Sequence, residues 1–242
     1  MAREITLVVT CEHGGREVPA AYADLFSGRE ALLDSHRGWD PGALELAAQM
    51  AEALGVALYA GTTTRLLVEL NRSLGHRQLF SEVTRPLPAA LRQEIIAQHY
   101  RPHRDRVEGD VGRQVAAGRR VIHVASHSFT PNLDGVERRA DIGWLYDPLR
   151  PGEGAFARAW MRHFAQRDPA LRLRRNYPYR GRSDGLTSLL RKRFPDDAYV
   201  GIELEVNQRF VAAGGAPWIR LRADLVDSLA LTLVDASTGA TS

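Results

Sequence analysis

Short apolar runs rich in β-branched residues alternate along the chain with longer segments whose apolar residues recur every three or four positions. The first pattern is typical of buried β-strands and the second of amphipathic helices. Their alternation predicts an α/β fold in which helices flank a central sheet. The expected strands cover residues 5–10, 56–59, 66–70, 120–125, 142–146, 171–174 and 199–206, and the expected helices cover 41–54, 88–117, 154–166, 185–193 and 216–234.

The segment 41–54 carries the clearest helix signals. Asp40 is a favourable N-cap residue, Pro41 fits the first helical position, and Gly55 fits the C-terminal stop. No internal repeat, low-complexity tract or Pro/Gly/Ser-rich linker divides the 242 residues. We therefore expect one domain over residues 1–242, with a frayed tail over the small, polar stretch 235–242.

Composition and charge exclude several classes of protein. The chain is 44% hydrophobic and 25% charged, and its net charge of +3 is too small to require a nucleic-acid partner. The apolar run 5–9 is far shorter than the ~20 residues that span a bilayer. A single cysteine, Cys11, cannot form an internal disulfide. We expect a cytoplasmic protein without a membrane or nucleic-acid partner, and the sequence leaves its oligomeric state open.

Two histidines stand near the ends of expected strands, where ligands collect in α/β folds. His13 follows the first strand and precedes two glycines, and His127 follows the strand 120–125. His123 lies within that strand, and in an extended chain it is ~13 Å from His127. One metal ion therefore cannot take both, and we expect His123 in the core and His127 in a site.

Two acidic residues share one face of the strand 199–206, with apolar residues on the opposite face. If this strand is central, burying Glu203 and Glu205 without partners is expensive, so a metal, an arginine or a catalytic water must lie nearby. The alternative is an edge strand whose polar face is solvated. At the end of the expected strand 66–70, Asn71 and Arg72 fit either a substrate carboxylate or a surface ion pair.

Six motifs together resemble the N-formylglutamate amidohydrolase family, over about residues 8–209. They are Cys-Glu-His-Gly-Gly at 11–15, His-Arg-Gly-Trp-Asp-Pro-Gly-Ala at 36–43, Glu-Leu-Asn-Arg-Ser at 69–73, Ser-His-Ser at 126–128, Asn-Tyr-Pro-Tyr at 176–179 and Glu-Leu-Glu-Val-Asn-Gln at 203–208. The layout is more distantly similar to aspartoacylase and the zinc carboxypeptidases. The resemblance implies a phosphorylase/hydrolase-like fold with a central mixed, mostly parallel sheet and metal-dependent hydrolysis of an N-acyl amino acid.

The resemblance also implies a set of metal ligands. His13 and His127 correspond to ligands of Zn²⁺ or another divalent metal. The distant relatives carry H-x-x-E, but here Arg16 occupies the glutamate position and Glu17 comes one residue later. We therefore assign the carboxylate ligand to Asp40, with Glu17 as the alternative, while Asp40 also has a competing role as a helix cap.

The same resemblance implies catalytic and substrate-binding roles. Glu205 corresponds to the general base, and Glu203 is its neighbour on the same strand face. The residues expected to bind the carboxylate of a small anionic N-acyl amino acid, such as N-formyl-L-glutamate, are Arg72, Asn71, Arg65 and Arg180. The alternatives are a metallopeptidase or deacylase for another acyl group and a non-catalytic binder of an anionic ligand. A nucleic-acid binder is least favoured, because no basic stripe interleaved with aromatic residues is present.

Overall fold

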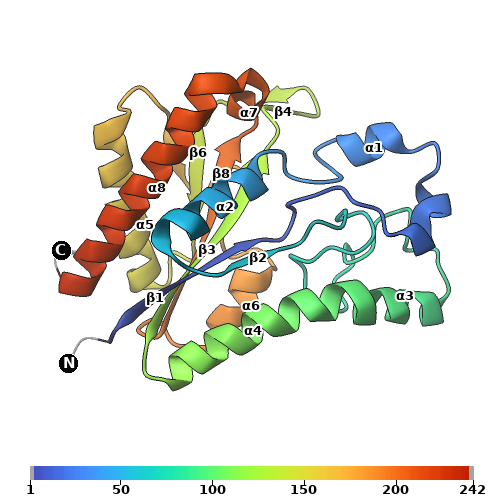
Figure 1. Cartoon of the computed structure of the whole chain (residues 1–242), viewed down its shortest axis with the longest axis horizontal. Helices are drawn as coiled ribbons and strands as arrows, with labels where there is room; N and C mark the ends of the chain where they lie inside the picture. The colour runs from blue at the N-terminus through green and yellow to red at the C-terminus, as the bar shows by residue number, and fades with distance from the viewer. Residues whose placement is uncertain (1–2, 240–242) are drawn as a thin grey trace.

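A computed structural model describes residues 3–239 of the chain. Its centre is a six-stranded sheet with the strand order β2-β1-β3-β8-β6-β7 (Figure 1). In that order the strands are Leu58–Ala60, Ile5–Cys11, Arg120–Phe129, Tyr199–Asn207, Ile142–Leu145 and Leu173–Arg175. Strands β8 and β6 pair antiparallel, and the other neighbours pair parallel. This confirms the expected α/β fold with a central mixed, mostly parallel sheet.

Helices cover both faces of this sheet, as Figure 1 shows. Apolar residues of α2 (Ala43–Leu54), α5 (Pro151–Arg167) and α8 (Gly215–Thr238) form the largest core cluster with one face. On the other face, α4 (Arg101–Ala116) and α6 (Leu186–Arg193) pack against β1, β3 and β8. The remaining elements are η1 (Ala20–Phe26), α1 (Glu30–Asp34), α3 (Ala89–Ile95), η2 (Ile96–Tyr100), β4 (Asn132–Leu133), β5 (Val136–Glu137) and α7 (Arg209–Ala213).

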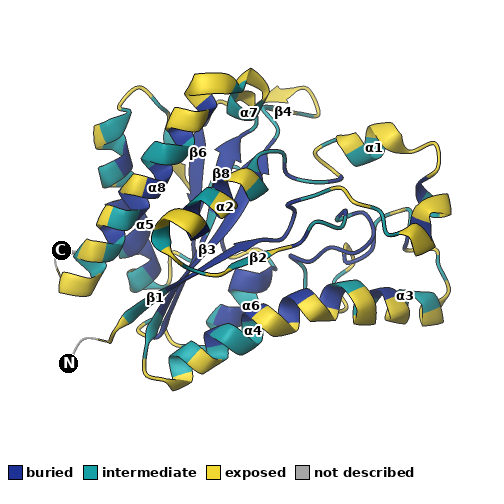
Figure 2. Ribbon diagram, viewed as in Figure 1, coloured by how far each residue is buried: buried dark blue, intermediate teal, exposed yellow. Residues whose placement is uncertain are grey.

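Strand β8 is central, so the alternative of a solvated edge strand is wrong. It lies between β3 and β6, and Figure 2 shows the central strands in the buried colour. The apolar side chains of β8 belong to the core cluster beneath α2, α5 and α8. The opposite face of the same strand therefore carries Glu203 and Glu205 toward the inside of the protein rather than toward solvent.

The expected strand 66–70 is wrong. This segment is buried, but its backbone forms turns: the Leu67 N–H bonds locally to the carbonyl of Thr64, and the Glu69 N–H bonds to that of Leu79 in the following loop. Its apolar side chains form a second core cluster with η1, including Tyr22. The apolar run therefore predicted correctly that the segment is buried, but it did not show whether the segment pairs with a strand.

Three other expected elements can be compared with the structure. The helix expected over 88–117 runs without a break through α3, the π-helical turn η2 and α4, and Pro102 lies directly after this turn. Strand β3 continues to Phe129. Helix α8 continues to Thr238, beyond the expected end at residue 234, so the expected tail 235–242 is helical up to Thr238, and residues 240–242 lie outside the described part.

No helix in residues 3–239 is long and apolar enough to span a membrane.

Candidate active site

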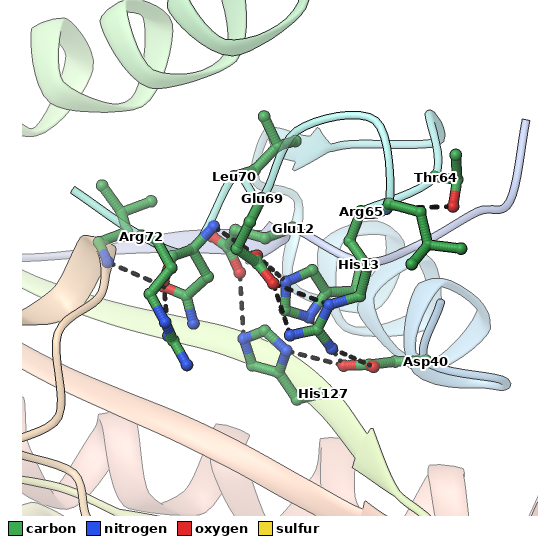
Figure 3. A network of polar contacts seen from close by, with 12 residues as sticks. Glu12, His13, Asp40, Thr64, Arg65, Glu69, Leu70, Arg72 and His127 are labelled. Carbon is green, nitrogen blue, oxygen red and sulfur yellow. Dashed lines mark hydrogen bonds and ion pairs between the residues drawn. The ribbon is translucent and has the colours of Figure 1, made fainter. Parts of the chain in front are cut away.

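Two imidazoles and one carboxylate meet at the carboxyl ends of β1 and β3 (Figure 3). His13 follows β1, His127 lies in β3, and Asp40 precedes α2; all three are buried. Asp40 Oδ2 lies 3.1 Å from His13 Nδ1 and 2.9 Å from His127 Nδ1. Potential ligand atoms of the three residues all lie within 4.8 Å of one another. The structure therefore brings together the three residues expected to bind metal.

Asp40 is held at this point by its backbone and not by a capping role. Helix α2 begins at Ala43, its N-cap is Gly42 in a left-handed conformation, and no side chain caps it. The Asp40 N–H donates to the carbonyl of His13 at 2.9 Å, which fixes the two residues side by side. The expected capping role of Asp40 is therefore wrong, and its carboxylate faces the two imidazoles.

Glu17, the alternative carboxylate ligand, lies elsewhere. Its side chain is exposed and accepts a hydrogen bond from Thr62 Oγ1 at 2.7 Å. It does not belong to the group formed by His13, Asp40 and His127. The geometry thus favours Asp40 over Glu17.

A buried carboxylate also stands behind each imidazole. His127 Nε2 lies 3.1 Å from Glu12 Oε2, and His13 Nε2 contacts Glu69 Oε1. This arrangement of carboxylate, histidine and ligand position is the usual outer shell of metal sites, because it fixes the ring and its tautomer. Neither Glu12 nor Glu69 was expected at the site from the sequence, where the one signal for each was an acidic residue inside an otherwise apolar segment.

The buried charges around these rings are mainly negative. Glu12, Asp40, Glu69 and Glu205 are all buried, and Arg65 pairs with only Asp40 and Glu69. Neither carboxylate oxygen of Glu12 has a well-aligned hydrogen bond within residues 3–239. Buried negative charge without compensation is costly, so this donor set fits a bound cation.

The pKa shifts follow from this crowding of charges. Burial by itself raises the pKa of the Asp40 carboxyl, but the adjacent imidazoles and Arg65 outweigh burial and hold that pKa well below its usual range. Burial likewise lowers the pKa of His127, but its bonds to Asp40 and Glu12 outweigh burial and raise that pKa well above its usual value. Without a metal, a proton on His127 thus compensates part of the negative charge.

Glu205 lies beside this group on the neighbouring strand. In the register of β3 and β8, His127 is paired with Glu205 and Ala125 with Glu203. Burial is the largest cause that raises the pKa of Glu205 to about 8. Its Oε2 atom is buried and has no hydrogen-bond partner in the described part of the chain. Glu203 is half-buried and accepts a hydrogen bond from Thr187 Oγ1 at 2.8 Å, so this carboxylate is already engaged.

The site opens into a cavity of about 240 Å³, which we call the site cavity. The metal-binding candidates, Glu203, Glu205 and the four expected substrate-binding residues all contribute to its wall. Of those four, Arg180 is exposed. Arg72 donates through Nη1 to the backbone carbonyls of Asn71 and Asp184 at 2.8 and 2.9 Å. The structure thus gathers the expected residues around one cavity.

The other two expected substrate-binding residues, Asn71 and Arg65, have partners that restrict them. The Asn71 side-chain oxygen accepts a hydrogen bond from the Leu186 N–H at 2.8 Å. Arg65 pairs with Glu69 and lies 3.3 Å from Asp40. Asn71 therefore holds the start of α6, and Arg65 holds the two carboxylates.

His123 is in the core, as its position within the strand predicts. It is fully buried, with its ring nitrogens 2.9 Å from Thr10 Oγ1 and 2.7 Å from Tyr199 Oη. Burial lowers its pKa to about 4.

Comparisons with known proteins concern the family and the fold. The family model for N-formylglutamate amidohydrolase matches residues 5–212. A crystallised gene product of Agrobacterium tumefaciens is similar over 95% of this chain and 90% of its own, with 28% identity and a TM-score of 0.80. A crystallised N-formylglutamate amidohydrolase from Ralstonia eutropha JMP134 is similar in fold over 96% of this chain and 94% of its own, with 20% identity and a TM-score of 0.68. No curated protein matches the chain.

Proposed function

The chain belongs to the N-formylglutamate amidohydrolase family, and from this we propose that it hydrolyses the amide bond of N-formyl-L-glutamate or a related N-acyl amino acid. The observation that carries the proposal is the convergence of His13, Asp40 and His127 on one point, with the unpartnered carboxylate of Glu205 beside them. This combination provides a cation site and a base at the same end of one cavity.

His13, Asp40 and His127 would hold the metal, with Zn²⁺ as the first candidate. Two imidazoles and a carboxylate, with a position left for water or substrate, are the donor set of a common class of catalytic zinc site. When bound, such an ion supplies Lewis-acid activation of the amide carbonyl and of a water molecule. The excess of buried carboxylates supports a divalent cation here.

Glu12 and Glu69 orient the two histidine ligands. Glu69 accepts a hydrogen bond from His13 Nε2, and Glu12 lies 3.1 Å from His127 Nε2, so both carboxylates favour a proton at Nε2 and leave the Nδ1 lone pair directed at Asp40 Oδ2 and at the ligand position. Arg65 neutralises Glu69 from the other side and keeps that carboxylate from turning away. These three residues are positioning residues, because they act through the ligands.

Glu205 acts as the general base. A carboxylate whose pKa lies near neutrality accepts a proton readily and returns it readily, and burial moves the pKa of Glu205 in this direction. A cation at the adjacent group lowers this pKa again, so that Glu205 starts the reaction as the anion. Its Oε2 then takes the proton of the attacking water and delivers it to the departing amine nitrogen. Glu203 accepts a hydrogen bond from Thr187, and its carboxylate adds negative charge to this face of β8.

Arg72 and Arg180 bind the substrate carboxylate. Both line the site cavity, and neither forms an ion pair with a carboxylate within residues 3–239. Arg72 is held in place by two backbone carbonyls, so its remaining N–H groups are available for an anion.

Turnover of N-formyl-L-glutamate by purified protein with added Zn²⁺ tests the proposal. We expect Glu205→Gln to lower kcat by about 10²–10⁴-fold, the usual contribution of a general base. Glu203→Gln, on the same face of the same strand, is the matched control and should lose much less. Equal kcat for wild type and Glu205→Gln would show that Glu205 is not the base.

Two further measurements separate the remaining alternatives. Competition among N-formyl, N-acetyl and peptide substrates distinguishes a formyl hydrolase from a deacylase or peptidase that uses the same residues. Metal analysis of protein purified without chelators identifies the ion. Tight glutamate binding without metal and without hydrolysis would instead indicate a non-catalytic anion binder.

A further inference from the structure

A second cavity, of about 300 Å³, opens beside the site cavity. The two cavities share part of their wall, including His36, Arg72 and Tyr179. The two cavities thus lie on either side of shared side chains. A substrate longer than one N-acyl amino acid would reach past these side chains from the site cavity into the second cavity.

The acidic residues in the wall of the second cavity already have partners. Glu82 forms an ion pair with Arg37 at 2.7 Å, and Glu69 forms one with Arg65 at 2.6 Å. Both pairs contribute to the wall of this cavity. Their charges cancel, so these residues give the cavity little net charge.

Two further arginines of the same wall have no such partner. Neither Arg72 nor Arg85 forms an ion pair with a carboxylate in the described part of the chain. Arg72 is fixed by the backbone carbonyls of Asn71 and Asp184, and Arg85 donates through Nη2 to the carbonyl of Phe80 at 3.2 Å. Carbonyl oxygens hold a guanidinium in place without removing its charge. Arg72 also lines the site cavity, where it is assigned to the first carboxylate, so Arg85 is the partly fixed cation that the second cavity does not share with the site cavity.

We propose that the second cavity binds an additional carboxylate, carried by a substrate that extends beyond the N-acyl amino acid held in the site cavity. The inference rests on the proposed function and specifies its substrate class. Guanidinium groups bind carboxylates through paired, charge-assisted hydrogen bonds, which gives both affinity and orientation. Phe80 and Leu66 add apolar wall against which the connecting chain packs.

This carboxylate has two possible positions in the substrate. It belongs either to a second acidic residue on the amino-acid half or to a dicarboxylic acyl group on the other half. Matched pairs of compounds distinguish the two. N-formyl-glutamyl-glutamate against N-formyl-glutamyl-glutamine tests the first position, and N-succinyl-glutamate against N-succinamoyl-glutamate tests the second. Within each pair, size is preserved and one negative charge is removed.

Arg85→Gln is the variant that tests the cavity. Arg85 lines the second cavity but not the site cavity. Arg77→Gln is its matched control, because Arg77 is exposed, lies close in the sequence and lines neither cavity. For each protein, kcat/KM is measured on all four compounds, and calorimetry measures their binding to chelator-treated protein.

We expect the acidic member of at least one pair to be preferred by about tenfold in wild type and in Arg77→Gln, and this ratio to fall to about one in Arg85→Gln. The pair that shows the preference identifies the half of the substrate. The inference is overturned if neither pair shows a preference, or if Arg85→Gln leaves the ratio unchanged. Binding and turnover separate the two proposals. A binding preference without hydrolysis would support the carboxylate site in the second cavity and overturn the proposed function. Hydrolysis without a preference would support the proposed function and overturn the carboxylate site.

Discussion

Strand β3 carries two histidines on one face, four residues apart, and they lie in opposite surroundings. The ring of His123 meets two neutral hydroxyls, from Thr10 and Tyr199. The ring of His127 lies between two carboxylates, Asp40 Oδ2 on Nδ1 and Glu12 Oε2 on Nε2. Both are buried, and yet burial lowers the pKa of His123, whereas the two carboxylates overcome burial and raise that of His127.

The difference shows what decides the role of a buried histidine. Burial and strand position are nearly the same for the two rings, so neither can distinguish them. What differs is the charge of the groups around each ring. A ring satisfied by hydroxyls is a neutral part of the core, whereas a ring between carboxylates lies where a cation is stabilised. The following predictions test whether this distinction controls function.

The largest expected effect is the loss of activity in His127→Gln. Without this imidazole the metal site loses one of its three protein ligands, and with it an ion that contributes several kcal/mol to transition-state stabilisation. We expect kcat/KM to fall by about a thousandfold or more and metal content to fall well below that of wild type. His123→Gln, four residues away on the same strand, should keep its metal. Equal metal content in both variants would remove the distinction between the two rings.

The second effect is on stability and concerns the other ring. His123→Ala removes a fully buried side chain and leaves the hydroxyls of Thr10 and Tyr199 without their partner. We expect the free energy of unfolding to fall by about 2–4 kcal/mol, from the cavity and the unmade hydrogen bonds together. Urea denaturation of chelator-treated protein measures it. If the variant is as stable as wild type but binds no metal, His123 belongs to the site and not to the core.

The third prediction compares the partners of the two rings. Glu12→Gln removes the carboxylate behind His127, and we expect metal affinity to fall by about ten- to a hundredfold, as for other outer-shell carboxylates of metal sites. Tyr199→Phe, which removes a partner of His123, is the matched control and should leave metal affinity unchanged. Competition with a chelator of known affinity gives both values. A loss in Tyr199→Phe as large as that in Glu12→Gln would mean that the measurement reports general loosening of the sheet.

Local patterns were enough to predict part of this site. The alternation along β8 placed Glu203 and Glu205 on one face, because side-chain direction in a strand has a period of two residues. The prediction that placed His123 in the core and His127 in the site rested on a strand that ends near residue 125, whereas β3 runs past His127 to Phe129, so its stated reason was wrong although the two placements hold. These features depend on the chain within a few residues.

Other features depend on contacts between distant segments. The partner of His13 Nε2 is Glu69, 56 residues away in the sequence, and no local pattern marks that contact. The same holds for the segment 66–70, which has the composition of a strand but packs against η1 without a strand beside it. The four motifs that supply His13, Asp40, Glu69 and His127 could be ordered from sequence, but their convergence required the fold.

The smallest expected effect is a pH dependence of stability that only His123 contributes. Its folded pKa of about 4 lies below the usual 6.5 of an unfolded histidine, so the unfolded state binds the proton more readily. The contribution of His123 is therefore fully present above pH 6.5 and is lost as the pH falls toward 4. Between pH 8 and pH 5.5, we expect the stability difference between wild type and His123→Gln to shrink by about 1.4 kcal/mol, and other groups cancel because both proteins carry them. Urea denaturation of chelator-treated proteins at the two pH values gives this difference. If it stays constant, or grows toward acid pH, His123 is charged in the folded protein and the contrast with His127 disappears.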